Sequence, residues 1–114
     1  MRPWVAFFSQ TGTEIHELSN ALGIYPSAIV TNNIFPTRIN SNLLSVTKFR
    51  EIKLNEEIWY QMPSNRPTVF DYNYVLEKFE NPVVTLHGFL KIVPKEICDR
   101  YEIYNLSLIH ISEP

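Results

Sequence analysis

The sequence predicts an α/β fold built on an open, mostly parallel sheet with helices on both faces. Residues 4–8 (WVAFF) and 83–86 (VVTL) are short, almost wholly apolar runs. Such runs are typical of parallel strands that are buried on both faces. The first run leads directly into a tight turn and a helical pattern, and strand and helix patterns alternate along most of the chain. This alternation predicts a Rossmann-like arrangement.

The segment after the first strand predicts a turn and an amphipathic helix. Residues 9–12 (SQTG) form the turn, and Ile15, Leu18 and Leu22 then recur at helical spacing. Gly23 stands where a glycine commonly ends a helix. Strand, tight turn and helix together are the start of a β-α-β unit.

The start of this helix also has the spacing of a capping box. Thr11 and Glu14 are three residues apart, and in a capping box each of the two side chains accepts a hydrogen bond from the other residue's backbone N–H. We therefore expect the Glu14 carboxylate to turn back toward the backbone at the helix start.

The middle of the chain is harder to interpret. Residues 28–30 (AIV) predict a second strand. Residues 34–67 are rich in asparagine and interrupted by prolines, with short strands predicted at 45–49 and 58–60.

The second half returns to a regular pattern. A helix is predicted over residues 68–79, with Thr68 as its cap and Asn-Pro after it. The buried strand at 83–86 follows, then a helix over 94–100 that begins at a proline, then a strand from residue 103.

Composition limits the functional classes. The chain has 114 residues, a net charge of −2 and scattered charges, so it is sized for one domain and has no basic patch for nucleic acid or a membrane surface. No apolar stretch is long enough to cross a bilayer. Cys98 is the single cysteine, which excludes an internal disulfide and fits a cytoplasmic location. We expect Cys98 to lie in the core, and we expect no metal site because no second ligand has suitable spacing.

Two stretches resemble the folate-dependent formyltransferases, with the phosphoribosylglycinamide formyltransferases as the nearest model. Residues 86–94 (LHGFLKIVP) resemble the family segment L-A-G-F-M-R-I-L-(S/P)-P, and residues 9–15 (SQTGTEI) resemble its S-G-N-G-S-N-L loop. In the family a helix and a strand follow the first segment and end in N-I-H-P-S, and Asn105 stands at the matching distance. The resemblance covers residues 4–105, about the first half of a family domain.

The resemblance implies a reaction in which an amine attacks the formyl carbon of 10-formyltetrahydrofolate. The tetrahedral intermediate carries a negative oxygen, which an amide and an imidazole stabilise while a carboxylate helps to move protons. The resemblance makes Asn105 that amide. Taken alone, an asparagine in this position is also a common way to end a strand.

The resemblance also implies a folate pocket formed by Leu90, Lys91, Ile92 and Val93. Lys91 corresponds to an arginine beside the pteridine ring in the family. Core packing of the three apolar residues and simple exposure of the lysine are the alternative interpretations, and both roles are compatible.

A third implied site is the acceptor's phosphate, held by Thr11, Gly12 and Thr13 at a helix start, where backbone N–H groups favour anions. A plain strand-to-helix turn is the alternative. Gln10 and Glu14 replace a glycine and an asparagine of the family loop. A carboxylate near a phosphate is unfavourable, so these changes put the phosphoribosyl acceptor in doubt more than the folate.

The family histidine is expected two residues after Asn105, where this chain has Ser107. Residues 106–114 (LSLIHISEP) instead match the in-frame translation of a transposon-end adapter used in DNA sequencing libraries. We therefore expect residues 1–105 to be the front part of a formyltransferase domain, incomplete on its carboxyl-terminal side and inactive alone. Residues 106–114 are interpreted as a non-natural tail, so that His110 is no substitute for the missing histidine.

His87 replaces a small residue of the family segment. We expect a buried imidazole with its hydrogen bonds satisfied, and contact with the cofactor is the alternative.

The acceptor and the function class stay open. Glycinamide ribonucleotide, an intermediate of purine biosynthesis, is the first choice of acceptor. The methionyl-tRNA and amino-sugar formyltransferases share the same core, and only a tRNA-type acceptor would bring a nucleic-acid partner. The second class is a non-catalytic, nucleotide-binding α/β module that keeps the scaffold alone.

Overall fold

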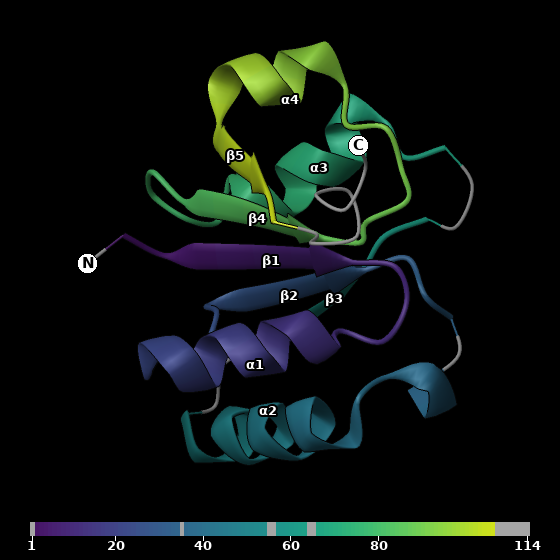
Figure 1. Ribbon diagram of the computed structural model, residues 1–114. Helices are drawn as coiled ribbons and strands as arrows, with labels where there is room; N and C mark the ends of the chain where they lie inside the picture. The colour runs from purple at the N-terminus through teal and green to yellow at the C-terminus, as the bar shows by residue number, and fades with distance from the viewer. Residues whose placement is uncertain (1, 35, 55–56, 64–65, 107–114) are drawn as a thin grey trace, which may run out of the picture.

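The computed structural model describes residues 2–34, 36–54, 57–63 and 66–106 of the chain. These residues form a five-stranded sheet in which every neighbouring pair is parallel, in the order β3-β2-β1-β4-β5 (Figure 1). The strands are β1 (Trp4–Phe8), β2 (Ala28–Thr31), β3 (Trp59–Gln61), β4 (Val83–His87) and β5 (Glu102–Asn105). The helices are α1 (Thr13–Leu22), η1 (Pro36–Arg38), α2 (Ser41–Leu54), α3 (Val69–Leu76) and α4 (Lys95–Arg100). The predicted α/β class is confirmed, and the mostly parallel sheet is wholly parallel within this part of the chain.

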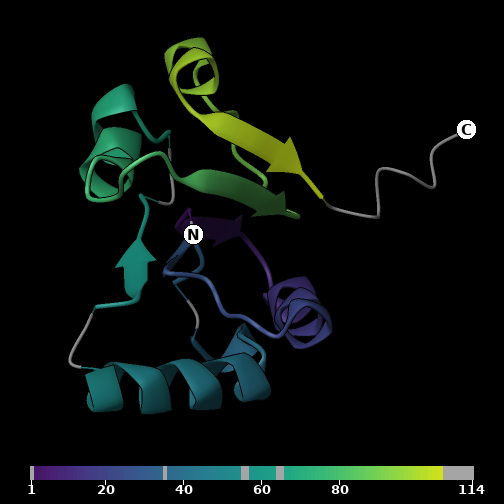
Figure 2. The ribbon, with the colours of Figure 1, turned by 90° about the vertical axis from the view of Figure 1, so that its left-hand side faces the viewer.

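Helices cover both faces of the sheet, as predicted. Helices α1 and α2 lie on one side, and α3 and α4 lie on the other (Figures 1 and 2). Strand β1 is buried along its whole length because alternate residues enter two different cores. Val5 and Phe7 join the core under α3 and α4, whereas Trp4, Ala6 and Phe8 join the core under α1 and α2. This double burial explains why the run has no polar alternation.

The central strand β1 lies between β2 and β4, and the chain changes direction across the sheet at this point. Ligands of open α/β sheets bind beyond the carboxyl ends of the strands at such a switch point. Two loops meet there, because the backbone N–H of Leu90 donates to Ser9 Oγ at 2.7 Å. A ligand site is therefore expected at the loops after β1 and β4.

The predicted capping box at the start of α1 is wrong. Gly12 is the residue before the helix, with a left-handed φ of 76°, and no side chain caps the helix. Because Gly12 takes the capping position, Thr11 lies one residue too early for the box. A Cβ at Gly12 would lie 2.8 Å from Leu43 Cδ2, so the loop packs closely against α2. The predicted helix end is confirmed, since Gly23 N–H donates to Ser19 O at 2.8 Å.

The strand predicted at residues 45–49 is also wrong, because this segment lies inside α2. Its β-branched and aromatic residues favour a strand in isolation. The Asn40 side chain, however, accepts a hydrogen bond from Leu43 N at 3.0 Å and caps a helix start. Leu43 and Thr47, one turn apart, are then both buried. The other short strand prediction, 58–60, is confirmed with a shift of one residue as β3.

The helices on the opposite face follow the predictions closely. Thr68 caps α3, and its backbone N–H donates to Asp71 Oδ2 at 2.7 Å in a true capping box. The helix ends at Leu76 rather than at residue 79. Pro94 precedes α4, whose buried residue is Ile97. Cys98 is exposed, so the prediction that it lies in the core is wrong. Ile97 takes the buried position of this short helix, and Cys98, which follows it, faces solvent. No helix within the described ranges is long and apolar enough to cross a membrane.

Candidate functional site

Two pockets flank the carboxyl end of β4, one on each side of the sheet. Strand β4 ends at His87, and Gly88 follows in a left-handed conformation with φ of 65°. Because side chains alternate along a strand, Leu86 packs on the core under α3 and α4, while His87 faces α1. The two pockets therefore receive different residues from one strand end.

The pocket on the α3 side, which we call the basic pocket, has a volume of about 470 Å³. It is lined by Arg66, Pro67, Leu90, Lys91, Ile92 and Pro94. The predicted residues Leu90, Lys91 and Ile92 thus lie together. Val93 does not line the pocket and packs against the core instead. Arg66 was missed by sequence reasoning because it lies in the irregular middle segment, where no motif marks it.

The loop that forms the basic pocket is anchored from inside. The Phe89 ring packs edge-on against Phe7, with ring centroids 5.3 Å apart, and against Tyr72 at 6.5 Å. On the outer side, Leu90 is 66% exposed and Ile92 is 91% exposed. The core-packing alternative is therefore wrong for Leu90 and Ile92. Two large apolar side chains at the surface beside two cations suit a ligand with a flat apolar part and an anionic part.

Asn105 is the last residue of β5, and it lies at the same carboxyl ends of the strands as the two pockets. It pairs in register with Leu86 of β4, so its side chain is on the α3 side. Asn105 is exposed at the strand end, and Leu106 N–H donates to Leu86 O at 2.9 Å just beyond it. Leu106 is the first residue of the predicted tail, and the remaining residues of that tail, 107–114, lie outside the described residues.

The predicted phosphate loop uses its polar groups internally. The hydroxyls of Thr11 and Thr13 lie 2.9 Å apart and share a hydrogen bond. Asn40 N–H donates to Thr11 O at 2.8 Å, and the Asn40 amide donates to Thr13 Oγ1 at 3.3 Å. Thr11, Gly12 and Thr13 are thus held by the segment before α2, and both hydroxyls already have partners.

The second pocket, on the α1 side, is called the acidic pocket and has a volume of about 370 Å³. It is lined by Glu14, Glu17, Leu18, His87 and Leu106. Sequence reasoning missed this pocket because residues 14 and 87 are far apart in the chain, and because the expected capping box gave Glu14 a different role.

A chain of buried polar groups leads to the acidic pocket. Trp4 Nε1 donates to Thr85 Oγ1 at 2.7 Å, and the same hydroxyl lies 2.7 Å from His87 Nε2. The His87 side chain is only 2% exposed, and its Nδ1 lies 3.6 Å from Glu14 Oε1. This distance is longer than a hydrogen bond. Neither Nδ1 nor Oε1 has a hydrogen-bond partner among the described residues. The prediction of a buried imidazole is confirmed, but one of its two nitrogens is unsatisfied.

The electrostatics of His87 follow from its burial. Burial lowers the pKa of the imidazole below its usual 6.5, and the nearby Glu14 carboxylate opposes this effect only in part. The ring is therefore neutral at neutral pH. Its two nitrogens then provide one donor and one acceptor.

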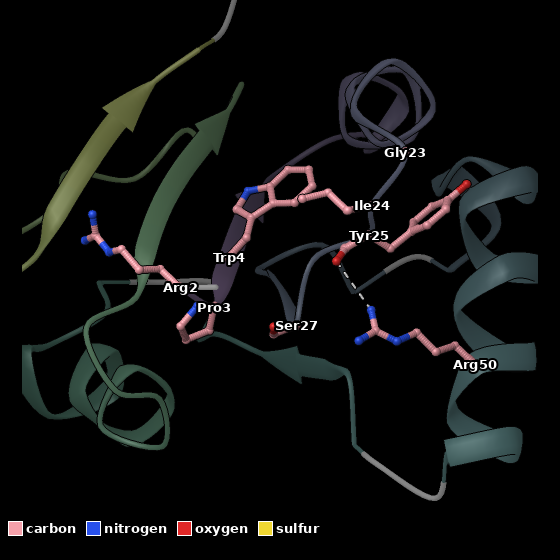
Figure 3. Close-up of a pocket in the computed structure, with 8 residues that line it drawn as sticks. All are labelled: Arg2, Pro3, Trp4, Gly23, Ile24, Tyr25, Ser27 and Arg50. Carbon is pink, nitrogen blue, oxygen red and sulfur yellow. Dashed lines mark hydrogen bonds between the residues drawn. The ribbon is translucent and has the colours of Figure 1, made fainter.

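A further pocket, of about 520 Å³, lies at the opposite edge of the sheet (Figure 3). Its lining includes Arg2 and Arg50, but both guanidinium groups have structural partners. Arg50 Nη1 donates to Pro26 O at 2.8 Å, and Arg2 Nη1 lies 2.9 Å from Glu102 Oε1. Because this pocket is at the amino ends of the strands, away from the switch point, we do not assign it a ligand.

The comparisons with known proteins add no further constraint. No protein-family model, no curated protein and no solved structure matches the chain. Among the described residues, no group of three or more His, Cys, Asp or Glu side chains is arranged to hold a metal ion.

Proposed function

We propose that this fold serves folate-dependent formyl transfer, in which 10-formyltetrahydrofolate donates its formyl group to an amine. The observation that carries the proposal is the basic pocket. Leu90, Lys91 and Ile92, the residues that the formyltransferase resemblance assigns to the folate, line one pocket with Arg66. Three consecutive residues lie together in any loop, so the support comes from the pocket at this loop and from Arg66, which the fold adds to it.

The chemistry of the basic pocket suits a reduced folate. The pteridine ring is flat and apolar on its faces, and Leu90 and Ile92 offer it exposed apolar surface. Lys91 stands between them and, as the resemblance implies, lies beside the pteridine ring. The glutamate tail of a folate carries carboxylates, and Arg66 is a cation that can pair with one of them. The single cysteine of the chain fits a reducing compartment such as the cytoplasm, where we place this activity.

Asn105 is our proposed amide donor to the negative oxygen of the tetrahedral intermediate. The end of β5 lies beside the end of β4, whose following loop carries Leu90 and Lys91. An asparagine amide N–H is a suitable oxyanion donor, and removal of one such donor typically lowers turnover by about 10²–10³-fold. The histidine and aspartate of the family mechanism are not assigned to any residue of this chain.

Binding of 5-formyltetrahydrofolate, a stable reduced folate, tests the proposal without requiring turnover. We expect saturable binding, measured by calorimetry, and about tenfold weaker binding for Arg66→Ala, which removes a cation opposite a carboxylate, and for Lys91→Ala, which removes the cation beside the pteridine ring. Lys95→Ala is the matched control. Lys95 is also exposed and pairs with Asp99 at 2.6 Å, outside the basic pocket, so its removal should leave the affinity unchanged.

The same titration addresses the rival class, a nucleotide-binding module. Its strand order resembles that of dinucleotide-binding sheets, but the loop after β1 has Gly12 as its single glycine where such folds have three. Tight binding of NAD or ATP with no binding of the folate would favour the rival. Folate affinity that is unchanged in both pocket variants would refute the assignment of the basic pocket.

A further inference from the structure

We propose that the acidic pocket binds the protonated amino group of the acceptor between Glu14 and His87, and that the acceptor carries no phosphate at this position. The inference deepens the proposed formyl transfer, on which it rests, by naming the acceptor as an amine that binds in its cationic form. The bound ammonium gives one proton to Glu14 or His87, and its nitrogen then has the lone pair that attacks the formyl carbon. It differs from the phosphoribosyl acceptor that the formyltransferase resemblance suggests.

The first argument is geometric. His87 Nδ1 and Glu14 Oε1 are buried, face each other at 3.6 Å without a hydrogen-bond partner among the described residues, and belong to residues that line one pocket. Neither atom is accessible as the side chains stand, so the partly exposed Glu14 side chain turns outward to admit an ammonium nitrogen, which then lies at about 2.8 Å from each atom. Buried polar atoms without partners are rare in folded proteins and are costly unless a ligand or water satisfies them.

The hydrogen bonding of Thr85 allows His87 to accept from such a ligand. The Thr85 hydroxyl has two lone pairs, of which Trp4 N–H occupies one. His87 can therefore donate from Nε2 to the other lone pair, which leaves Nδ1 as an acceptor toward the pocket. A neutral imidazole in this tautomer suits an ammonium donor.

The second argument is charge. Glu14 and Glu17 are the charged residues among the described pocket lining, and no lysine or arginine accompanies them. A phosphate would meet a negative site in a partly desolvated setting, which is strongly unfavourable. An ammonium group would be attracted, and Leu18 provides an apolar wall for its carbon chain.

The third argument concerns the neighbouring loop. In the resembled family this loop holds a phosphate, but here the Thr11 and Thr13 hydroxyls bond to each other and Thr13 also accepts from Asn40. Glu14 stands where the family has asparagine, and its side chain faces His87 instead of capping the helix. The Thr11 and Thr13 hydroxyls, which correspond to the phosphate-binding loop of the resembled family, are thus occupied within their own segment. Glu14, in the next position, adds a carboxylate that faces His87.

Three small probes with a common butyl chain test the inference on the intact chain. We expect n-butylammonium to produce saturable shifts of the His87 ring nitrogens in NMR titrations, with butanol binding much more weakly and butyl phosphate not binding. Glu14→Gln should weaken n-butylammonium binding about tenfold, because it removes a charge-assisted hydrogen bond. Glu96→Gln, the matched control at an exposed glutamate of α4 outside the acidic pocket, should leave the affinity unchanged.

Equal binding of butyl phosphate and n-butylammonium to the wild-type chain would overturn the inference, and this comparison requires no variant to fold. Unchanged affinity in a folded Glu14→Gln variant would also overturn it. The outcome is separable from the folate test. Amine binding without folate binding would refute formyl transfer and keep the amine site, whereas folate binding without amine binding would refute only the amine site.

Discussion

The two sides of the β4 carboxyl end differ in both charge and construction. The basic pocket is open, with Arg66 and Lys91 at its surface and aromatic packing of Phe89 beneath it. The acidic pocket instead ends on a buried polar chain that runs to His87. The difference follows from strand alternation, which sends Leu86 to one face and His87 to the other. One strand end can therefore hold two ligands of opposite charge, an anionic folate on one side and a cationic amine on the other.

The buried polar chain gives the largest expected effect. Thr85→Val keeps the shape of the side chain but removes the hydroxyl that serves both Trp4 Nε1 and His87 Nε2. Two buried polar groups then lose a partner, so we expect the free energy of unfolding to fall by about 2–4 kcal/mol. Urea unfolding measures the loss. A change below about 1 kcal/mol would mean that the hydrogen bonds from Trp4 through Thr85 to His87 contribute little to the stability of the fold.

The loops after β1 and β4 each contain a glycine with a left-handed backbone, and the effects of substituting these two glycines provide the next comparison. Gly12→Ala should destabilise by about 2–3 kcal/mol, because it combines a left-handed backbone with a close contact to Leu43. Gly88→Ala is the matched substitution on the other loop. It has the same backbone strain but open space around the new Cβ, so we expect a loss of only about 1 kcal/mol. Equal losses would show that the Gly12 loop has no special packing against α2.

On the α3 side, a polar atom is buried without a role. The Tyr72 hydroxyl has no hydrogen-bond partner among the described residues, and burial raises the pKa of Tyr72 to about 12. Tyr72→Phe keeps the ring contact with Phe7 and removes this hydroxyl. We expect thermal unfolding to show a neutral effect or a gain of up to about 1 kcal/mol, opposite in sign to Thr85→Val. A clear loss of stability would reveal a partner for the hydroxyl.

The smallest expected effect is the pH dependence of stability that the buried His87 on the acidic side contributes. The pKa of His87 is lower in the folded chain than its usual 6.5, so below that value the unfolded chain binds more protons than the folded chain. The stabilising contribution is thus fully present above about pH 6.5 and is lost as the pH falls. His87→Gln should flatten this dependence in urea unfolding measured between neutral and mildly acidic pH. An identical pH profile in the variant would show that His87 is not buried as a neutral ring.

Much of the fold could be predicted because its signals are local. The apolar run 4–8, the cap at Thr68 and the glycine at 23 each report the backbone of their own segment, and each is confirmed. The failures arose where distant residues decide. The segment 45–49 has strand-forming side chains, but its cap by Asn40 and its packing on the sheet make it helical. Thr11 and Glu14 have the spacing of a capping box, but Gly12, which packs against Leu43, is the residue in the capping position.

The sequence by itself determined the alternating α/β pattern. The family resemblance marked Leu90, Lys91, Ile92 and Val93 as one group, of which Val93 packs on the core instead of lining the pocket. Only the tertiary structure brought Arg66 to that group and set Glu14 beside His87. These pairings join segments more than twenty residues apart, and their cause is the crossover that places β4 against β1. Local periodicity contains no information on which strand ends become neighbours, so the charges of the two pockets emerge only when the sheet is assembled.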